Sequence, residues 1–141
     1  AQEILRLAIS QADIVKMSDE EILFVSGKDD LEDGIKDLWC DGWRALVVTY
    51  GPKGSRFITP EFDGFVPSYK ITAVDATGAG DGCTAGFLSR LLKDPDLLGS
   101  EEKLRDACAF ANAVGAITAT KRGAINALPT EKEVEAFLSA R

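Results

Sequence analysis

The sequence predicts an α/β fold in which helices flank a mainly parallel sheet. Short apolar runs suited to buried strands, at residues 13–17 and 45–49, alternate with segments whose apolar residues recur at helical spacing. This alternation is typical of layered α/β domains, because each helix covers one face of the sheet. The 141 residues, 45% hydrophobic and 28% charged, are enough for one soluble domain, or part of one, with a core of its own.

Three helices are predicted in the first part of the chain. Ser18 and Glu21 have the S-x-x-E spacing of a capping box, and Gly27 is suited to end the helix that this box begins. The other two segments carry apolar residues on one helical face. We expect these helices at residues 2–10, 19–26 and 29–40.

The strand at residues 45–49 is β-prone throughout, and we expect it to be central and fully buried. A turn is predicted at Gly51–Gly54. Two further segments, around 55–59 and 64–72, are split by Asp63–Gly64 and resemble an antiparallel extension of the sheet.

Helices dominate from Gly80 onward. The first is expected at residues 79–93, and the second, at 101–119, is rich in Ala and Gly. Thr130 and Glu133 form a second capping box, which predicts a final helix to about residue 140.

Composition excludes several classes of function. A net charge of -7 and a pI near 4.6 disfavour nucleic acid as a partner. The chain has no histidine, so it cannot assemble a Ser-His-Asp triad or an imidazole zinc site. Cys40, Cys83 and Cys108 are widely spaced, which indicates reduced packing residues and a cytoplasmic protein. No apolar run approaches the roughly 20 residues that a membrane span needs, so no membrane is expected as a partner.

The segment Thr77–Gly82 predicts an anion-binding site. Small residues stand where a loop becomes a helix, so unpaired backbone N–H groups can converge on a phosphate. Asp81 beside such a site could accept the proton of an alcohol during phosphoryl transfer. The alternative is that Asp81 only caps its helix.

The standard phosphate motifs are absent. There is no GxxxxGK[ST] and no GxGxxG in a βαβ setting, which disfavours a P-loop or a Rossmann dinucleotide site. Thr49–Gly54 instead follows the apolar strand, where ligands of open α/β sheets usually bind. Taken alone, this segment predicts only a hairpin turn. Lys53 and Arg122 are candidates for phosphate contact, although either could be a solvated surface charge.

The run Asp75–Asp81 resembles the Asp-x-Thr-Gly-Ala-Gly-Asp signature of the ribokinase/PfkB sugar kinases. The resemblance extends along the whole chain, and residues 110–113, 120–124 and 127–130 are most similar to the fructokinase branch. It implies a ribokinase-like layered fold. It also implies that residues 1–141 are the C-terminal nucleotide-binding and catalytic part of one domain, which uses ATP and Mg²⁺.

The resemblance implies roles for individual residues. Asp81 would be the base for the sugar hydroxyl, and the amides of Gly78, Ala79 and Gly80 would form the anion hole. Asn112 would lie beside the adenine. The residues expected near the nucleotide are Thr49, Gly51, Lys53, Gly54, Asn112 and Gly123.

Two metal roles also follow from the resemblance. Family members commonly bind a monovalent cation such as K⁺, for which Asp75 and Thr77 would be ligands together with loop carbonyls. Many relatives have Asn-x-x-Glu after the early strand, where the Glu acts on Mg²⁺ through water. This chain has Ser18 in place of the Asn and keeps Glu21, whose capping box is an equally good structural explanation.

The family's N-terminal sugar-binding half and lid have no counterpart in these residues, which begin without methionine inside a predicted helix. We therefore expect the isolated chain to have little or no kinase activity and the full-length protein to form a homodimer. Fructose is the favoured substrate. Alternatives are a kinase for ribose, 2-keto-3-deoxygluconate or a nucleoside, and a non-catalytic module that retains the fold.

Overall fold

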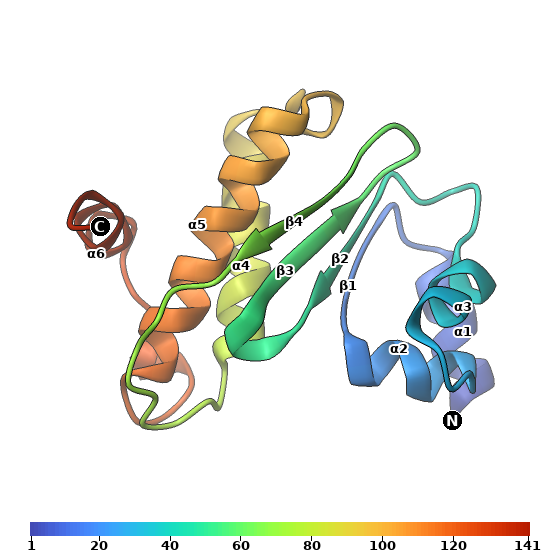
Figure 1. Cartoon of the computed structure of the whole chain (residues 1–141), viewed down its shortest axis with the longest axis horizontal. Coiled ribbons are helices and arrows are strands. Elements are labelled where there is room, and N and C mark those ends of the chain that lie inside the picture. Colours follow the sequence, from blue (N-terminus) through green and yellow to red (C-terminus); the bar gives the residue numbers. More distant parts are fainter.

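A sheet between two layers of helices organises the computed structural model, which describes residues 1–141 (Figure 1). The predicted α/β class is confirmed. In chain order the elements are α1 (Gln2–Ser10), β1 (Ile14–Ser18), α2 (Asp19–Ser26), α3 (Leu31–Leu38), β2 (Ala45–Thr49), β3 (Gly54–Ile58), β4 (Asp63–Pro67), α4 (Ala79–Lys93), α5 (Glu101–Ala119) and α6 (Glu131–Ser139). Single 3₁₀ turns lie at Gly51–Lys53, Leu97–Gly99 and Ile125–Ala127. None of the helices combines the length and the apolar character that a bilayer span would require.

The four strands pair in the order β1-β2-β3-β4. β1 and β2 are parallel, with Ser18 opposite Thr49, so both strands end at the same edge of the sheet. β3 and β4 extend the sheet by antiparallel pairing, as predicted. The sheet within this chain is therefore mixed, with one parallel pair rather than a mainly parallel set.

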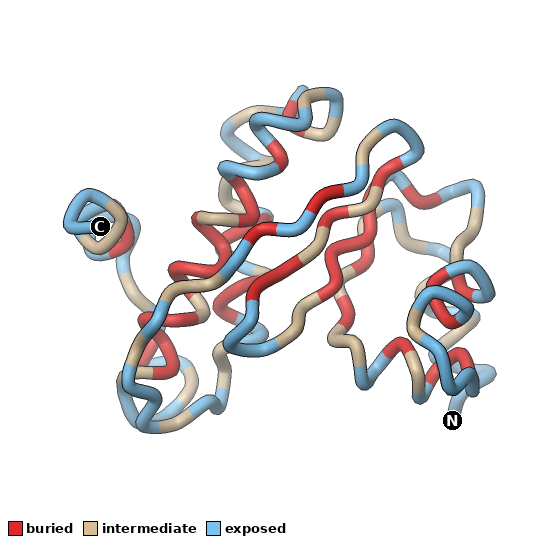
Figure 2. Tube along the Cα trace, in the orientation of Figure 1, coloured by how far each residue is buried: buried red, intermediate tan, exposed pale blue.

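The alternation of side chains along β2 creates two cores. Val47 packs on one face with residues of α4 and α5, including Leu104. Leu46 and Val48 pack on the opposite face with residues of α2 and α3, including Ile22. β2 is therefore buried on both faces, as the sequence predicts for a central strand (Figure 2).

Both predicted capping boxes are present. The Ser18 hydroxyl accepts a hydrogen bond from the Glu21 N–H at 3.1 Å, and the Glu21 carboxylate accepts one from the Ser18 N–H at 2.7 Å. Thr130 and Glu133 reproduce the arrangement at α6. Gly27 ends α2 with a left-handed backbone (φ 69°), as expected.

Three predicted segments have the wrong boundaries. The turn between the antiparallel strands lies at residues 59–62, where the Thr59 hydroxyl accepts from the Phe62 N–H at 2.9 Å, so Asp63 and Gly64 belong to β4. The strand predicted to reach residue 72 ends at Pro67, and residues 68–77 are irregular. α3 is also shorter than predicted: Asp30 caps its start by accepting from the Asp33 N–H at 3.0 Å, and the helix ends at Leu38.

Candidate active site

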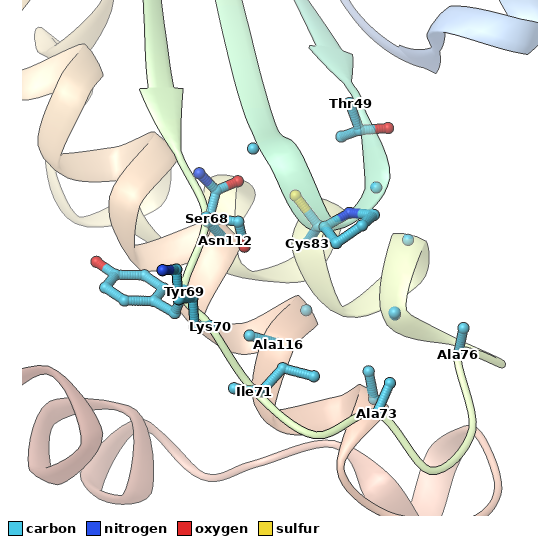
Figure 3. A pocket seen from close by; sticks show the side chains of 17 residues that line it. Thr49, Ser68, Tyr69, Lys70, Ile71, Ala73, Ala76, Cys83, Asn112 and Ala116 are labelled. Carbon is cyan, nitrogen blue, oxygen red and sulfur yellow. The ribbon is translucent and has the colours of Figure 1, made fainter.

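A cavity of about 630 Å³ opens at the carboxyl end of β2 (Figure 3). It lies among the β2–β3 turn, the irregular segment after β4, the start of α4 and the middle of α5. Ligands of open α/β sheets bind at this edge, where parallel strands end. The cavity brings together six of the predicted site residues, namely Thr49, Gly51, Gly54, Ala79, Gly80 and Asn112.

The turn at the cavity needs glycine for two different reasons. Gly54 has φ 135°, and a Cβ atom there would lie 2.2 Å from the Val66 carbonyl oxygen, so no side chain fits. Gly51 has φ 55°, a left-handed backbone conformation that favours glycine, although a Cβ atom there would meet nothing within 4 Å. Lys53 lies in the same turn but is exposed and does not line the cavity, so its predicted phosphate contact has no geometric support.

The start of α4 presents free backbone amides. The amides of Gly78, Gly80 and Asp81 donate to no acceptor in the protein. The Ala79 amide donates to the Ala76 carbonyl at 3.1 Å. Of the three amides expected to form the anion hole, that of Ala79 is engaged within the protein, whereas those of Gly78 and Gly80 and the neighbouring amide of Asp81 are free.

Asp81 is exposed in the first turn of α4 and makes no hydrogen bond or ion pair through its carboxylate. It thus has no capping role, which was the alternative to catalysis. Asp81 does not line the cavity, but its neighbour Gly80 does. The carboxylate is therefore accessible to an acceptor group arriving beside the cavity.

Lys16 lies beside the start of α4, although the sequence interpretation did not single it out. Its Nζ atom lies 3.3 Å from where a Cβ atom at Gly80 would be. It does not line the cavity and no acidic side chain forms an ion pair with it, so its charge is available to an anion bound at the start of α4. The signal in the sequence was one lysine inside the apolar run Ile14–Met17, on the face opposite Val15 and Met17.

Asp75 connects two loops beside the cavity. One oxygen of its carboxylate accepts from the Thr77 N–H at 3.0 Å, and the other accepts from the Gly123 N–H at 3.1 Å. Hydrogen bonds from Thr77 and then Gly123 lower the pKa of Asp75. The structure thus brings together Asp75, Thr77 and Gly123, and we name this arrangement the Asp75 clasp.

The Asp75 clasp bears on the predicted monovalent cation. Each carboxylate oxygen has a further lone pair, so the clasp is compatible with a cation held by carbonyls as well. Nowhere does the chain gather three or more His, Cys, Asp or Glu side chains suited to a metal. Gly123 lies in the clasp rather than on the cavity wall, and Arg122 is exposed beside it.

The remaining predicted residues have structural roles. Glu21 completes its capping box at the end of β1, the edge of the sheet that also carries Thr49. Asn112 is buried, and its side-chain amide donates to the Val66 carbonyl at 3.1 Å, which holds the end of β4 against α5. Its exposed edge lines the cavity.

The cysteines near the site are packing residues, as predicted. Cys83 and Cys108 are buried in the core beneath α4 and α5, and Cys83 also lines the cavity. Burial raises the pKa of Cys83, and it raises that of Cys108 to about 12. Neither thiol is suited to act as a nucleophile at neutral pH.

Comparison with curated proteins identifies plant fructokinases as relatives. The chain is 50% identical over 125 residues to fructokinase-1 of Oryza sativa subsp. japonica and 49% identical over 125 residues to fructokinase-1 of Zea mays. Each alignment covers 88% of this chain but 39% of the relative. The chain therefore spans well under half the length of these proteins.

Solved structures give the same relationship. The fructokinase of Vibrio cholerae O395 with bound fructose, ADP and calcium ion matches with a TM-score of 0.89 and 36% identity, covering 97% of this chain and 44% of that one. The ATP-bound fructokinase of Xylella fastidiosa matches with a TM-score of 0.90 and 28% identity, covering 99% and 46%.

A kinase for another acceptor is also similar. Aminoimidazole riboside kinase of Salmonella enterica, complexed with aminoimidazole riboside and an ATP analogue, matches with a TM-score of 0.83 and 31% identity, covering 98% of this chain and 46% of that one. A family model described as pfkB family carbohydrate kinase matches residues 1–131. The glycine-rich start of α4, the turn after β2 and these similarities lead to one conclusion: this chain belongs to the pfkB family of carbohydrate kinases.

Proposed function

We propose that this chain is the nucleotide-binding and catalytic part of an ATP-dependent sugar kinase. The observation that carries the proposal is the cavity at the end of β2, where free amides at the start of α4 face a glycine turn. A phosphate chain suits the amides, and the apolar remainder of the cavity suits a base. The Xylella fastidiosa relative binds ATP in a chain of the same fold, which supports this arrangement.

In the proposed reaction Asp81 accepts the proton of a sugar hydroxyl. The hydroxyl oxygen forms a bond to the γ-phosphorus while the bond from that phosphorus to the β–γ bridging oxygen breaks, and ADP leaves. The free amides of Gly80 and Asp81, with the Lys16 ammonium, stabilise the negative charge on the transferred phosphoryl group.

Two cations are part of the proposal. Mg²⁺ neutralises charge on the phosphates in reactions of this class, and Glu21 would hold it through water from the end of β1. A monovalent cation, K⁺, would bind at the Asp75 clasp, where its charge offsets that of the Asp75 carboxylate. A double mutant of the Vibrio cholerae fructokinase binds potassium ion, which supports this part of the proposal.

Fructose is the acceptor that we propose, with fructose 6-phosphate as the product. The support is the similarity to plant fructokinases and to a fructose-bound structure. The similarity to aminoimidazole riboside kinase keeps a nucleoside acceptor as a second candidate. Ribose and 2-keto-3-deoxygluconate kinases remain less supported alternatives, as does a non-catalytic module.

The test separates nucleotide binding from phosphoryl transfer. We would join this chain to the N-terminal portion of maize fructokinase-1, the part of that relative preceding the aligned residues, and measure fructose-dependent ADP formation. Asp81→Asn should lower turnover by about a thousandfold, in the range for loss of a general base, while nucleotide binding persists. Comparable turnover in that variant would overturn the assignment.

Asp96→Asn is the matched control, because Asp96 is exposed in the turn after α4 and its carboxylate makes no hydrogen bond or ion pair. It should leave turnover unchanged. A panel of fructose, ribose, 2-keto-3-deoxygluconate and nucleosides distinguishes the acceptors. Absence of turnover with all of them, despite nucleotide binding by the same chimera, would favour the non-catalytic module.

A further inference from the structure

One wall of the cavity is not held by hydrogen bonds of its own. Residues 69–73 supply Tyr69, Ile71 and Ala73 to the cavity, together with Lys70. This segment makes no hydrogen bond, whether through backbone or side chain, within the protein. Its flanks are held, since the Ser68 amide donates to Lys53 and the Val74 amide donates to Ala119. The position of this wall therefore depends on side-chain packing.

Tyr69 is the large side chain that anchors this wall. Its ring meets Phe137 of α6 edge to face, with centroids 5.3 Å apart and planes at 81°. The Arg141 guanidinium lies 4.0 Å from the Phe137 ring centroid and 6.0 Å from that of Tyr69. In Figure 3 the Tyr69 ring extends away from Ile71 and Ala116.

α6 is itself fixed to the body of the molecule. Val134 is buried against α5, in a cluster that also contains Phe110. At its start Glu131 forms ion pairs with Lys93 and Arg90 of α4. A wall attached to α6 is thereby attached to both helices that form the far side of the cavity.

We infer that α6 positions the base-binding end of the nucleotide site through the contact of Tyr69 with Phe137 and Arg141. The inference deepens the proposed function and rests on it. The cavity near this wall is lined by the apolar residues Ile71, Ala73 and Ala116, which suit the flat face of a purine. The free amides proposed to bind phosphate lie at the start of α4. In Figure 3 Ala76, which precedes α4, lies on the opposite side of the view from Tyr69.

Phe137 and Arg141 are thus positioning residues that touch no nucleotide. Both lie beyond the residues matched by the family model, which end at 131. Loss of the ring contact should loosen the wall that meets the base and leave the phosphate end unchanged. A general loss of stability would weaken both ends together.

The experiment measures binding of fluorescent N-methylanthraniloyl-ADP to this chain, and its displacement by inorganic tripolyphosphate. Phe137→Ala should weaken the binding of the ADP analogue about fivefold, the equivalent of about 1 kcal/mol for an aromatic pair. Tripolyphosphate, which has no base, should keep its own affinity. Phe137→Tyr retains the ring and should restore binding.

Glu135→Ala is the control, because Glu135 is exposed on α6 and its carboxylate makes no contact. It should bind the ADP analogue as the wild type does. Equal weakening of both ligands in Phe137→Ala, or weakening of neither, would overturn the inference while leaving the nucleotide site in place. Failure of the wild-type chain to bind either ligand would instead overturn the proposed function, and the inference with it.

Discussion

Asp75 shows how one carboxylate can make the site sensitive to acid. Its pKa lies below the ordinary value of 3.8, because the ionised form accepts hydrogen bonds from Thr77 and Gly123. A carboxyl group with a lowered folded-state pKa stabilises the fold above its unfolded-state pKa, and this contribution is lost as the pH falls through the folded-state value.

Asp75→Asn should therefore lower the melting temperature at pH 7, because the neutral amide is a weaker acceptor for both donors. The difference from the wild type should begin to shrink below about pH 4 and should vanish only as the pH falls through the lowered folded-state pKa, where the wild-type carboxylate becomes protonated in the folded protein as well. Thermal melts across pH 3 to 7 measure this. Asp41→Asn serves as the control, because Asp41 is exposed in a loop on the other side of the sheet, with no contact through its carboxylate. A constant difference at all pH values would contradict the explanation.

Lys16 provides a second prediction at the scale of single residues. Its ammonium lies beside the free amides of α4 without an acidic partner. Lys16→Met should weaken the binding of inorganic tripolyphosphate about tenfold, as for loss of one hydrogen bond to a charged group. Adenosine, which has no phosphate, should bind unchanged. Lys36→Met is the control, because Lys36 is exposed on α3. Equal effects of both variants on tripolyphosphate binding would indicate only a loss of overall charge.

Single residues also show what the sequence could and could not foresee. Asp81 was singled out because it adjoins a glycine-rich helix start and completes a run that resembles a family signature, and its catalytic role stays a prediction. Lys16 was overlooked because its approach to Gly80 joins β1 to α4, segments far apart in the chain. The engagement of the Ala79 amide by Ala76 depends on local dihedral angles, which residue types alone do not determine.

At the scale of elements, two substitutions in the turn after β2 would test why glycine is required there. Gly54→Ala places a methyl group 2.2 Å from the Val66 carbonyl, so β3 and β4 must separate there. Gly51→Ala meets no atom within 4 Å and incurs only the backbone strain of about 1 kcal/mol. Gly54→Ala should therefore lower the free energy of unfolding well beyond that amount, as measured by urea denaturation. Equal losses for the two variants would show that φ alone explains both glycines.

The bounds of helices and strands were predictable where they depend on residues close together in the sequence. The capping boxes at Ser18 and Thr130 depend on residues three positions apart, and both helices begin where predicted. The end of β4 was not predictable, because tertiary contacts fix it: the side-chain amide of Asn112 on α5 donates to the Val66 carbonyl, and Tyr69 packs against Phe137 of α6. These tertiary contacts leave no periodic signal in the sequence.

The whole molecule has one face that resembles an interface. Ala85, Leu88 and Leu92 follow Asp81 along one side of α4, and Leu92 is 83% exposed. β1 lies at the edge of the sheet with one side unpaired. Apolar helix faces and open strand edges of this kind favour association with further protein. Asp81 lies at the start of this side of α4. We therefore expect any protein that covers Ala85, Leu88 and Leu92 to contribute to the acceptor site as well.

Replacement of the apolar residues on this side of α4 should have opposite effects in the chain alone and in the chimera with the maize N-terminal portion. Replacing Leu88 and Leu92 together by Glu should reduce self-association of the isolated chain, measured by size-exclusion chromatography, because the added charges remain in water. In the chimera the same change should lower both thermal stability and fructose phosphorylation, because an unpaired carboxylate costs several kcal/mol when buried. Ile4→Glu on α1, which is 74% exposed on the opposite side of the sheet, should alter neither property of the chimera. A chimera that tolerates the double replacement would show that this face stays in solvent and that the acceptor reaches Asp81 without a partner on α4.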